Sequence, residues 1–575
     1  MATELIGIGI LFFCAIIGGI IAARFKQPAV FGMLLIGAII GPSSLNIVKD
    51  ANMIEMMAEL GAVLILFVIG LEFDISKLIK LGARSILIGF LKFAIVLFFG
   101  YETTLLVGFD AKTALFIGVI LSFSSTVVIV KVLEQKEMFR RKEVPLLIAV
   151  LIIEDILAVL ALTFFSGIRD SGRSILSTFE HVTFSIAILI FAYLIIMKIL
   201  RFIVNIILKN SSDESVLIFL SLSIGALFSY FAFYLGLTPS AGAFLAGSLI
   251  ASLPNSKEYG RAVHPIAMIL TSIFFISMGT MVNFKAVESN LALIIALILT
   301  ILVTRLIAVG FLTLLLANFK NEQAFFSSIA MISVGEFSLL IAKESQKFGV
   351  DVDLVTITAS IIFITAILMS IGINYSERLH NALNSRIPIK ARLKIERMSE
   401  YMRRFFDQME IETHFTKKLK SESRITLMLF ILALFAFFVL RRVSLAMKIS
   451  YNAVVLYVFY AISFILMIYL LNLVYKRSKV VHHTLSVILT NVDSSRNIKK
   501  CDRILDNLLL ALLLFFSAML FPFAIFVFNL NIWANVIPFL LITASFYYLR
   551  NSVALIDGHS LSSSGVSASI AVTKF

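Results

Sequence analysis

Residues 145–165, PLLIAVLIIEDILAVLALTFF, form an apolar stretch with two adjacent carboxylates, Glu154 and Asp155, near its centre. A helix rises about 1.5 Å per residue, so this stretch can cross a hydrocarbon core of about 30 Å with both acids near the midplane. A charged side chain at that depth costs about 2.5–3.5 kcal/mol even on mild insertion scales. The pair therefore predicts an ion or proton pathway. The alternative is an acid buried as a packing contact and neutralised by a basic partner.

The composition of the 575-residue chain is that of a polytopic, all-α membrane protein. Hydrophobic residues make up 60% of it and charged residues 15%, against about 45–50% and about 25% in soluble domains. The formal net charge of +14 does not indicate nucleic acid binding, because the basic residues are spread over short loops between apolar segments. With only Cys14 and Cys501, neither a disulfide framework nor a clustered thiolate metal site is available.

A window of membrane-span length predicts thirteen transmembrane helices, near residues 4–22, 28–47, 53–72, 83–107, 111–133, 144–166, 181–207, 215–236, 239–253, 265–282, 290–317, 323–344 and 352–376. Lysine and arginine gather in the loops after odd-numbered spans, for example Arg24 with Lys26 and Arg140 with Lys142. The positive-inside rule then puts the N-terminus outside and the end of span thirteen in the cytoplasm. The start, MATELIGIG, lacks a basic region, which favours a retained first span over a cleaved signal.

Three stretches of the chain recur in the same order about 210 residues later. They are VFGMLLIGAIIGP (30–42) with SAGAFLAGSLIAS (240–252), LFVIGLEFD (66–74) with FISMGTMVNF (275–284), and SFSSTVVIV (122–130) with ISVGEFSLL (332–340). Seven predicted spans separate the matched segments, and this odd number inverts the second copy in the membrane. Inverted repeats with interrupted spans indicate a secondary transporter whose site lies at the midplane between the copies.

The fifth and twelfth spans carry polar residues inside these matched segments. Ser124, Ser125 and Thr126 interrupt the fifth span, and Gly335 with Glu336 occupies the corresponding part of the twelfth. Hydroxyl groups and freed backbone carbonyls supply the oxygen ligands that hard cations such as sodium prefer. The alternative for the serines and threonine is helix packing by small residues.

One deep cation, Arg305, lies in the eleventh span. A buried guanidinium needs a partner and can bind a carboxylate through two parallel hydrogen bonds. The candidate partners are Glu154, Asp155 and Glu336. We therefore expect Arg305 and Glu336 to compensate charge around the site.

Together these motifs resemble the second monovalent cation:proton antiporter family, which includes Kef-type potassium efflux transporters and bacterial sodium:proton antiporters. The stretches that carry the resemblance are RFKQPAVFGMLLIGAIIGP (24–42), ELGAVLILFVIGLE (59–72), SSTVVIVKVL (124–133), Glu154 with Asp155, GLTPSAGAFLAGSLIA (236–251), FFISMGT (274–280) and VGEF (334–337).

The resemblance implies an inverted-repeat antiporter fold over residues 1–376, with the fifth and twelfth spans as two crossed discontinuous helices. It also implies a homodimer, and Asp155 as the residue that binds the cation and the proton in turn. Burial disfavours an ionised carboxyl group, so protonation of Asp155 competes with a cation that Asp155, Thr126 and neighbouring oxygens would hold. Exchange by alternating access follows, because the empty ionised site is too costly to carry through the barrier.

Two residues depart from the family pattern. Glu154 stands where the family commonly has Asp, Asn or Gln, and Arg305 where it often has Lys. A guanidinium does not release its proton at accessible pH. If Arg305 keeps Glu154 ionised, Asp155 alone titrates and one proton exchanges for one cation without net movement of charge. If Glu154 titrates as well, two protons move per cation and transport responds to voltage. No glycine-rich nucleotide-binding fingerprint follows residue 376.

The region after the thirteenth span has a different character. Residues 377–424 are rich in charge and predict a basic amphipathic cytoplasmic linker on an anionic leaflet, or else a solvated linker helix. Four more spans are predicted near 425–440, 451–475, 504–528 and 532–549. Their interiors lack charge, so we assign residues 425–550 to packing, assembly or lipid contact. The serine-rich tail, 551–575, is expected to be flexible.

The sequence therefore predicts a multi-pass transporter of the cell membrane that exchanges sodium or potassium for protons, without cofactor or enzymatic activity. Its expected partners are these ions, membrane lipid and a second copy of the chain. The alternatives are a potassium exporter, and a cation channel or receptor with an antiporter-like core. A channel needs a continuous polar lining or rings of charge, whereas deep charge here lies at one level, which favours a carrier.

Overall fold

The computed structural model describes residues 2–25, 29–48, 50–72, 82–169, 214–235, 237, 239–253, 256–317, 319–384, 413–426, 453–492, 498–528 and 536–560, with single residues and short stretches within 188–199, at 404 and within 428–440. The chain divides into two compact units, Met1–Ile387 with Met519–Ala534, and Pro388–Ala518 with Asn535–Phe575. Within the described residues, nine helices are long and apolar enough to cross a bilayer.

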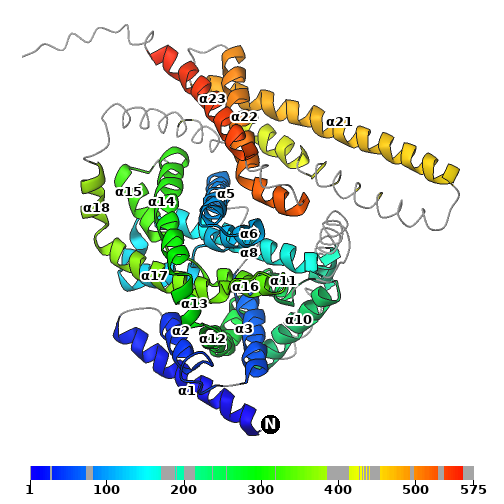
Figure 1. The fold of residues 1–575 in the computed structure, drawn as a ribbon. Helices are drawn as coiled ribbons and strands as arrows, with labels where there is room; N and C mark the ends of the chain where they lie inside the picture. The colour runs from blue at the N-terminus through cyan, green and yellow to red at the C-terminus, as the bar shows by residue number, and fades with distance from the viewer. Residues whose placement is uncertain are drawn as a thin grey trace, which may run out of the picture. The chain divides into compact units, whose positions relative to one another are not determined.

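The described residues of the first part of the chain form helices joined by short connections (Figure 1). Its helices are α1 (Ala2–Arg24), α2 (Ala29–Ile40), α3 (Ala51–Glu72), α5 (Gly82–Leu106), α6 (Ala111–Ser122), α7 (Thr126–Gln135), the 3-10 helix η1 (Met138–Arg140), α8 (Val144–Arg169), α10 (Glu214–Tyr234), α11 (Pro239–Ala251), α12 (Ser256–Thr280), α13 (Phe284–Ser289), α14 (Leu291–Leu316), α15 (Asn321–Ala330), α16 (Glu336–Gln346), α17 (Leu354–Asn374) and α18 (Ser376–Asn384).

Nearly every span predicted within the first 376 residues coincides with a helix or with a pair of helices. The seventh, near 181–207, lies mostly outside the described residues. Two boundaries were wrong. Helix α2 ends at Ile40, because Gly41 and Pro42 follow it, and α12 begins at Ser256 and carries Pro265 inside it. The first turns of α12 are polar, so an apolar window misses them.

Two groups of helices pack within the first unit. We call α1, α2, α3, α10, α11 and α12 the flanking bundle, and α5, α6, α7, α8, α14, α15, α16 and α17 the crossover bundle. In Figure 1, α1, α2, α3 and α12 lie together in the lower part of the view. In the flanking bundle α2 packs on α12 and α11 packs on α3, while in the crossover bundle α5 packs on α6 and α14 on α15. Each contact thus occurs twice, once in each copy of the inverted repeat.

Glycines at the helix contacts confirm the register of the repeat. A Cβ atom on Gly37 of α2 would lie 2.3 Å from the Ile276 carbonyl oxygen and 2.9 Å from the Cα of Gly279 in α12. A Cβ on Gly247 of α11 would lie 3.0 Å or less from backbone atoms of Gly70 and its neighbours in α3. The sequence repeat pairs Gly37 with Gly247 and Gly70 with Gly279, so the two close approaches are one contact made by both copies.

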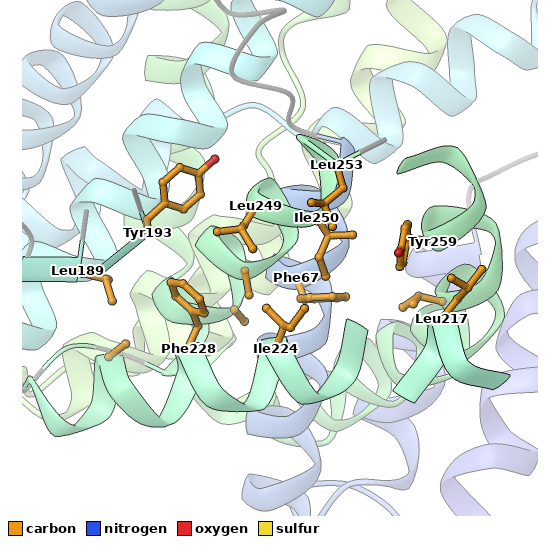
Figure 2. Close-up of a cluster of buried hydrophobic side chains, with 14 of the residues drawn as sticks. Phe67, Leu189, Tyr193, Leu217, Ile224, Phe228, Leu249, Ile250, Leu253 and Tyr259 are labelled. Carbon is orange, nitrogen blue, oxygen red and sulfur yellow. The ribbon is translucent and has the colours of Figure 1, made fainter. Parts of the chain in front are cut away.

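A buried apolar cluster holds α3, α10 and α11 of the flanking bundle together. Figure 2 shows Phe67 of α3 among side chains of α10 and α11, including Ile224, Phe228, Leu249 and Ile250. These residues are at most 7% exposed. Burial of a large apolar side chain contributes roughly 1.5–3 kcal/mol, so this cluster fixes the flanking bundle as a packed body.

After residue 387 the described helices include α21 (Ala453–Val492), α22 (Ile498–Phe528) and α23 (Val536–Ser560). The spans predicted near 451–475, 504–528 and 532–549 lie on them, and that near 425–440 lies mostly outside the described residues, as does most of the predicted 377–424 linker. Helix α21 continues past residue 475, because KRSKVVHHTLSV contains no proline or glycine. The tail was expected to be flexible from residue 551, but α23 continues to Ser560, and within it the Ser552 hydroxyl donates to the Ile504 carbonyl at 3.4 Å.

Candidate functional site

Both spans predicted to be discontinuous are broken at the centre of the crossover bundle. Helix α6 ends at Ser122 and α7 begins at Thr126, while α15 ends at Ala330 and α16 begins at Glu336. Extended backbone joins each pair, so the polar run of the fifth span and the glycine of the twelfth interrupt the helices as the sequence indicated.

The two extended segments cross as a short antiparallel bridge between Ser124 and Val334. The Ser125 N–H donates to the Ser333 carbonyl, and the Gly335 N–H to the Phe123 carbonyl, each at 3.1 Å. A Cβ on Gly335 would lie 2.6 Å from the Ser124 carbonyl oxygen, so a larger residue there would force the segments apart. The crossing brings the N-terminal ends of α7 and α16 and the C-terminal ends of α6 and α15 to one point.

Asp155 of α8 lies beside the start of α7. The Thr126 hydroxyl donates toward its carboxylate, at 3.2 Å from Oδ1 and 3.1 Å from Oδ2. Asp155 is 7% exposed, and the fully buried Glu154 is its neighbour in α8. Carboxylate and hydroxyl oxygens at this spacing are suitable ligands for a hard monovalent cation.

Glu336, the first residue of α16, lies on the other side of the same serine–threonine pair. The Ser125 hydroxyl donates to Glu336 Oε2 at 2.9 Å, and Glu336 is 5% exposed. Since Ser125 and Thr126 are adjacent, their hydroxyls connect Glu336 to Asp155. The crossing therefore gathers two acids and two hydroxyls that the sequence assigned to one site.

Arg305 of α14 reaches the same crossing, but it forms an ion pair with none of its three candidate partners. Its Nη2 donates to the Leu121 carbonyl at 2.7 Å and the Phe123 carbonyl at 3.3 Å, and its Nη1 to the Met331 carbonyl at 2.9 Å and to the Ser124 hydroxyl. Among the described residues no carboxylate forms an ion pair with it, so the expectation that Glu154, Asp155 or Glu336 would be its ion-pair partner was wrong. Its positive charge instead compensates carbonyl groups where α6 and α15 end.

Glu154 is paired by Lys92 of α5, a residue that the sequence analysis did not single out. Lys92 Nζ lies 2.6 Å from Glu154 Oε1 and also donates to the Ser122 carbonyl at 2.9 Å and the Ser124 hydroxyl at 2.8 Å. Both side chains are fully buried. A signal was present, because Lys92 is the one charge in the apolar run ILIGFLKFAIVLFF (86–99), and intramembrane charges mark functional sites.

Two of the residues proposed as cation or proton ligands, Glu154 and Ser124, bind basic side chains and each other. Glu154 Oε2 accepts the Ser124 N–H at 2.8 Å and Oε1 accepts from Lys92. The Ser124 hydroxyl accepts from both Lys92 and Arg305. These groups form the framework of the crossing, while Asp155 and Thr126 lie at its margin.

A helical membrane bundle in which two interrupted helices cross beside buried acids is the architecture of secondary cation transporters. Residues 9–375 match the family model described as sodium/hydrogen exchanger, transmembrane. The chain therefore belongs to the sodium/hydrogen exchanger family.

Relatives of known class agree with this assignment. The chain is 28% identical over 58% of its length to a probable Na⁺/H⁺ antiporter, GerT, of Bacillus cereus, of which it covers 88%. It is 29% identical over 60% of its length to a Na⁺/H⁺ antiporter of Enterococcus hirae, of which it covers 90%. The solved sodium proton antiporter MjNhaP1 of Methanocaldococcus jannaschii shares the fold with a TM-score of 0.52 and 18% identity, over 66% of this chain and 98% of that one.

Proposed function

We propose that this protein is a secondary transporter that exchanges a monovalent cation, sodium or potassium, for protons, with Asp155 as the shared cation and proton site. The observation that carries the proposal is the contact of the Thr126 hydroxyl with both Asp155 oxygens at the point where the interrupted helices cross. Membership in the sodium/hydrogen exchanger family supports the class of reaction.

In the proposed cycle, Asp155 and the hydroxyls of Thr126 and Ser125 coordinate a partly dehydrated cation. The aspartate and a monovalent cation form a neutral complex, which can change its access from one side of the membrane to the other. A proton neutralises Asp155 equally well, so the protonated carrier returns without metal. The empty, ionised site does not cross, because an uncompensated charge is costly in a medium of low dielectric constant.

Substitution of Asp155 tests this assignment directly. We expect Asp155→Asn in proteoliposomes with an internal pH-sensitive dye to abolish exchange, because the isosteric amide does not titrate. Asp353→Asn is the matched control, since Asp353 caps α17 through the Thr356 N–H and asparagine caps helices equally well. Full exchange by a folded Asp155→Asn protein would remove the central claim.

The same assay distinguishes the candidate cations when sodium, potassium and lithium are added one at a time. Proton flux with potassium alone would identify a potassium exporter. Cation flux that moves no protons in exchange and does not saturate would identify a channel.

The predicted homodimer, the cell membrane as its location and the external N-terminus belong to the same proposal. Their support is the resemblance to antiporters and the bias of lysine and arginine toward alternate loops. Cross-linking in native membranes and labelling of cysteines introduced into the loops test them.

A further inference from the structure

The two copies of the repeat hold the crossing by equivalent contacts. The Ser124 N–H donates to Glu154 Oε2 of α8 at 2.8 Å, and the Val334 N–H donates to the Thr365 hydroxyl of α17 at 3.2 Å. Ser124 and Val334 are the two members of the antiparallel bridge, 210 residues apart. Glu154 and Thr365 therefore have the same task, which is to accept one backbone N–H of the crossing segment.

The two buried basic side chains, Lys92 and Arg305, make similar contacts at the crossing. Lys92 lies on α5 and Arg305 on α14, the helices that precede the interrupted helices in the two copies. Lys92 binds the Ser122 carbonyl at the end of α6, Arg305 binds the Met331 carbonyl after α15, and both donate to the Ser124 hydroxyl. Lys92 thus makes contacts like those of Arg305, although 213 residues separate the two rather than 210.

One difference breaks this symmetry. Thr365 is neutral, whereas Glu154 is a carboxylate that lies 2.6 Å from the Lys92 ammonium group. A hydroxyl suffices to accept the backbone N–H, so the charge of Glu154 has a separate role. The contact with Lys92 supplies it, because two opposite charges buried together avoid the penalty that each would carry alone.

We propose that Lys92 and Glu154 are a positioning pair: they fix the backbone and hydroxyl of Ser124, and through it the orientation of the Ser125 and Thr126 hydroxyls, without exchanging protons during transport. The inference rests on the proposed function, because Thr126 and Ser125 meet the acids Asp155 and Glu336. It removes Glu154 from the cation ligands and makes Lys92 a determinant of cation affinity.

A double-mutant cycle tests the pair. Each single variant, Lys92→Met or Glu154→Gln, leaves one buried charge uncompensated and should lower both thermal stability and exchange. The double variant Lys92→Met/Glu154→Gln removes both charges, and the amide that replaces the carboxylate still offers an oxygen to the Ser124 N–H. We expect it to recover stability and maximal rate, while its apparent KM for the cation rises about 10- to 100-fold, as for other residues that orient ligands.

The pair Glu344 and Lys347 provides a matched control. Its members form an ion pair of 2.9 Å near the end of α16, away from the crossing. Lys347→Met/Glu344→Gln repeats the same chemical changes and should leave the apparent KM unchanged. A purely structural role of Lys92 and Glu154 would change stability without this selective effect on KM.

The pH profile and the number of protons per cation test whether Lys92 and Glu154 exchange protons during transport. Both should be unchanged in the Lys92→Met/Glu154→Gln double variant. A shifted profile, a lower proton count, or a folded double variant as inactive as the single ones would overturn the proposal.

The stability measurements, made in detergent, do not depend on transport. A wild-type protein that exchanges no cation would contradict the proposed function, while additive stability effects of the two substitutions would contradict the pair.

Discussion

Arg305 Nη2 lies 2.7 Å from the carbonyl oxygen of Leu121, a residue 184 positions earlier in the chain. This contact joins α14 of the second repeat to α6 of the first. The guanidinium also holds Met331, so one side chain binds backbone of both interrupted helices. The planar fork of a guanidinium has two terminal nitrogens, one for each of these carbonyls.

We therefore expect Arg305→Lys to impair the protein although it preserves the charge. A lysine offers one nitrogen in place of the two that bind the Leu121 and the Met331 carbonyls, and each buried acceptor left unpaired costs about 1–3 kcal/mol. Thermal unfolding in detergent and exchange in proteoliposomes measure the effect. The control is Arg24→Lys at the exposed end of α1. Unchanged stability and rate in Arg305→Lys would show that the fork is not needed.

The glycine contacts of the flanking bundle predict a second set of variants. Gly37→Ala puts a methyl group 2.3 Å from the Ile276 oxygen, and Gly247→Ala puts one 2.0 Å from the Phe67 oxygen. Such overpacking costs roughly 1–3 kcal/mol, measured as a lower temperature of thermal unfolding.

Gly9→Ala and Gly260→Ala are matched controls, because a Cβ at either position meets nothing within 4 Å. In these helices alanine should be neutral or stabilising by up to about 1 kcal/mol. Equal effects at all four positions would contradict the close approach of α2 to α12 and of α11 to α3.

Truncation tests the role of the C-terminal region. The family match ends at residue 375, and the crossing with its acids lies wholly before it. We expect a chain of residues 1–387 to retain proton-coupled exchange, with a change at most in regulation or stability. If the truncated protein inserts and is folded but exchanges nothing, the added helices belong to the mechanism.

The number of charges moved per cycle follows from the partners of the buried residues. Glu154 is paired with Lys92 and Arg305 keeps its proton, so we expect Asp155 alone to titrate and one proton to exchange for one monovalent cation. Exchange should then produce no transient current on a solid-supported membrane. It should also be independent of an imposed potassium diffusion potential.

A current would indicate a second titrating acid. Glu336→Gln and Glu154→Gln, compared in the same recordings, would identify it. Removal of the current by Glu154→Gln alone would also contradict the positioning role of that residue.

The sequence by itself determined the membrane class, the repeat and the position of the interruptions. Apolar length predicts spans because backbone groups must be satisfied within each helix in lipid. The repeat could be recognised because each copy keeps glycine where its helices approach closely, as at Gly37 and Gly279. The depth of Asp155 follows from its position within one apolar stretch. The break at the serine–threonine run likewise follows from adjacent residues alone.

Only the tertiary structure decided which charges are partners. The sequence named Glu154 as one of three candidate partners of Arg305, but Lys92, 62 residues away from Glu154, binds it instead. A carboxylate takes the cation that the fold brings within hydrogen-bond distance, and sequence separation does not encode that distance. Arg305 in turn binds backbone carbonyls, which every residue carries and which become distinctive only where interrupted helices leave them without an intrahelical partner.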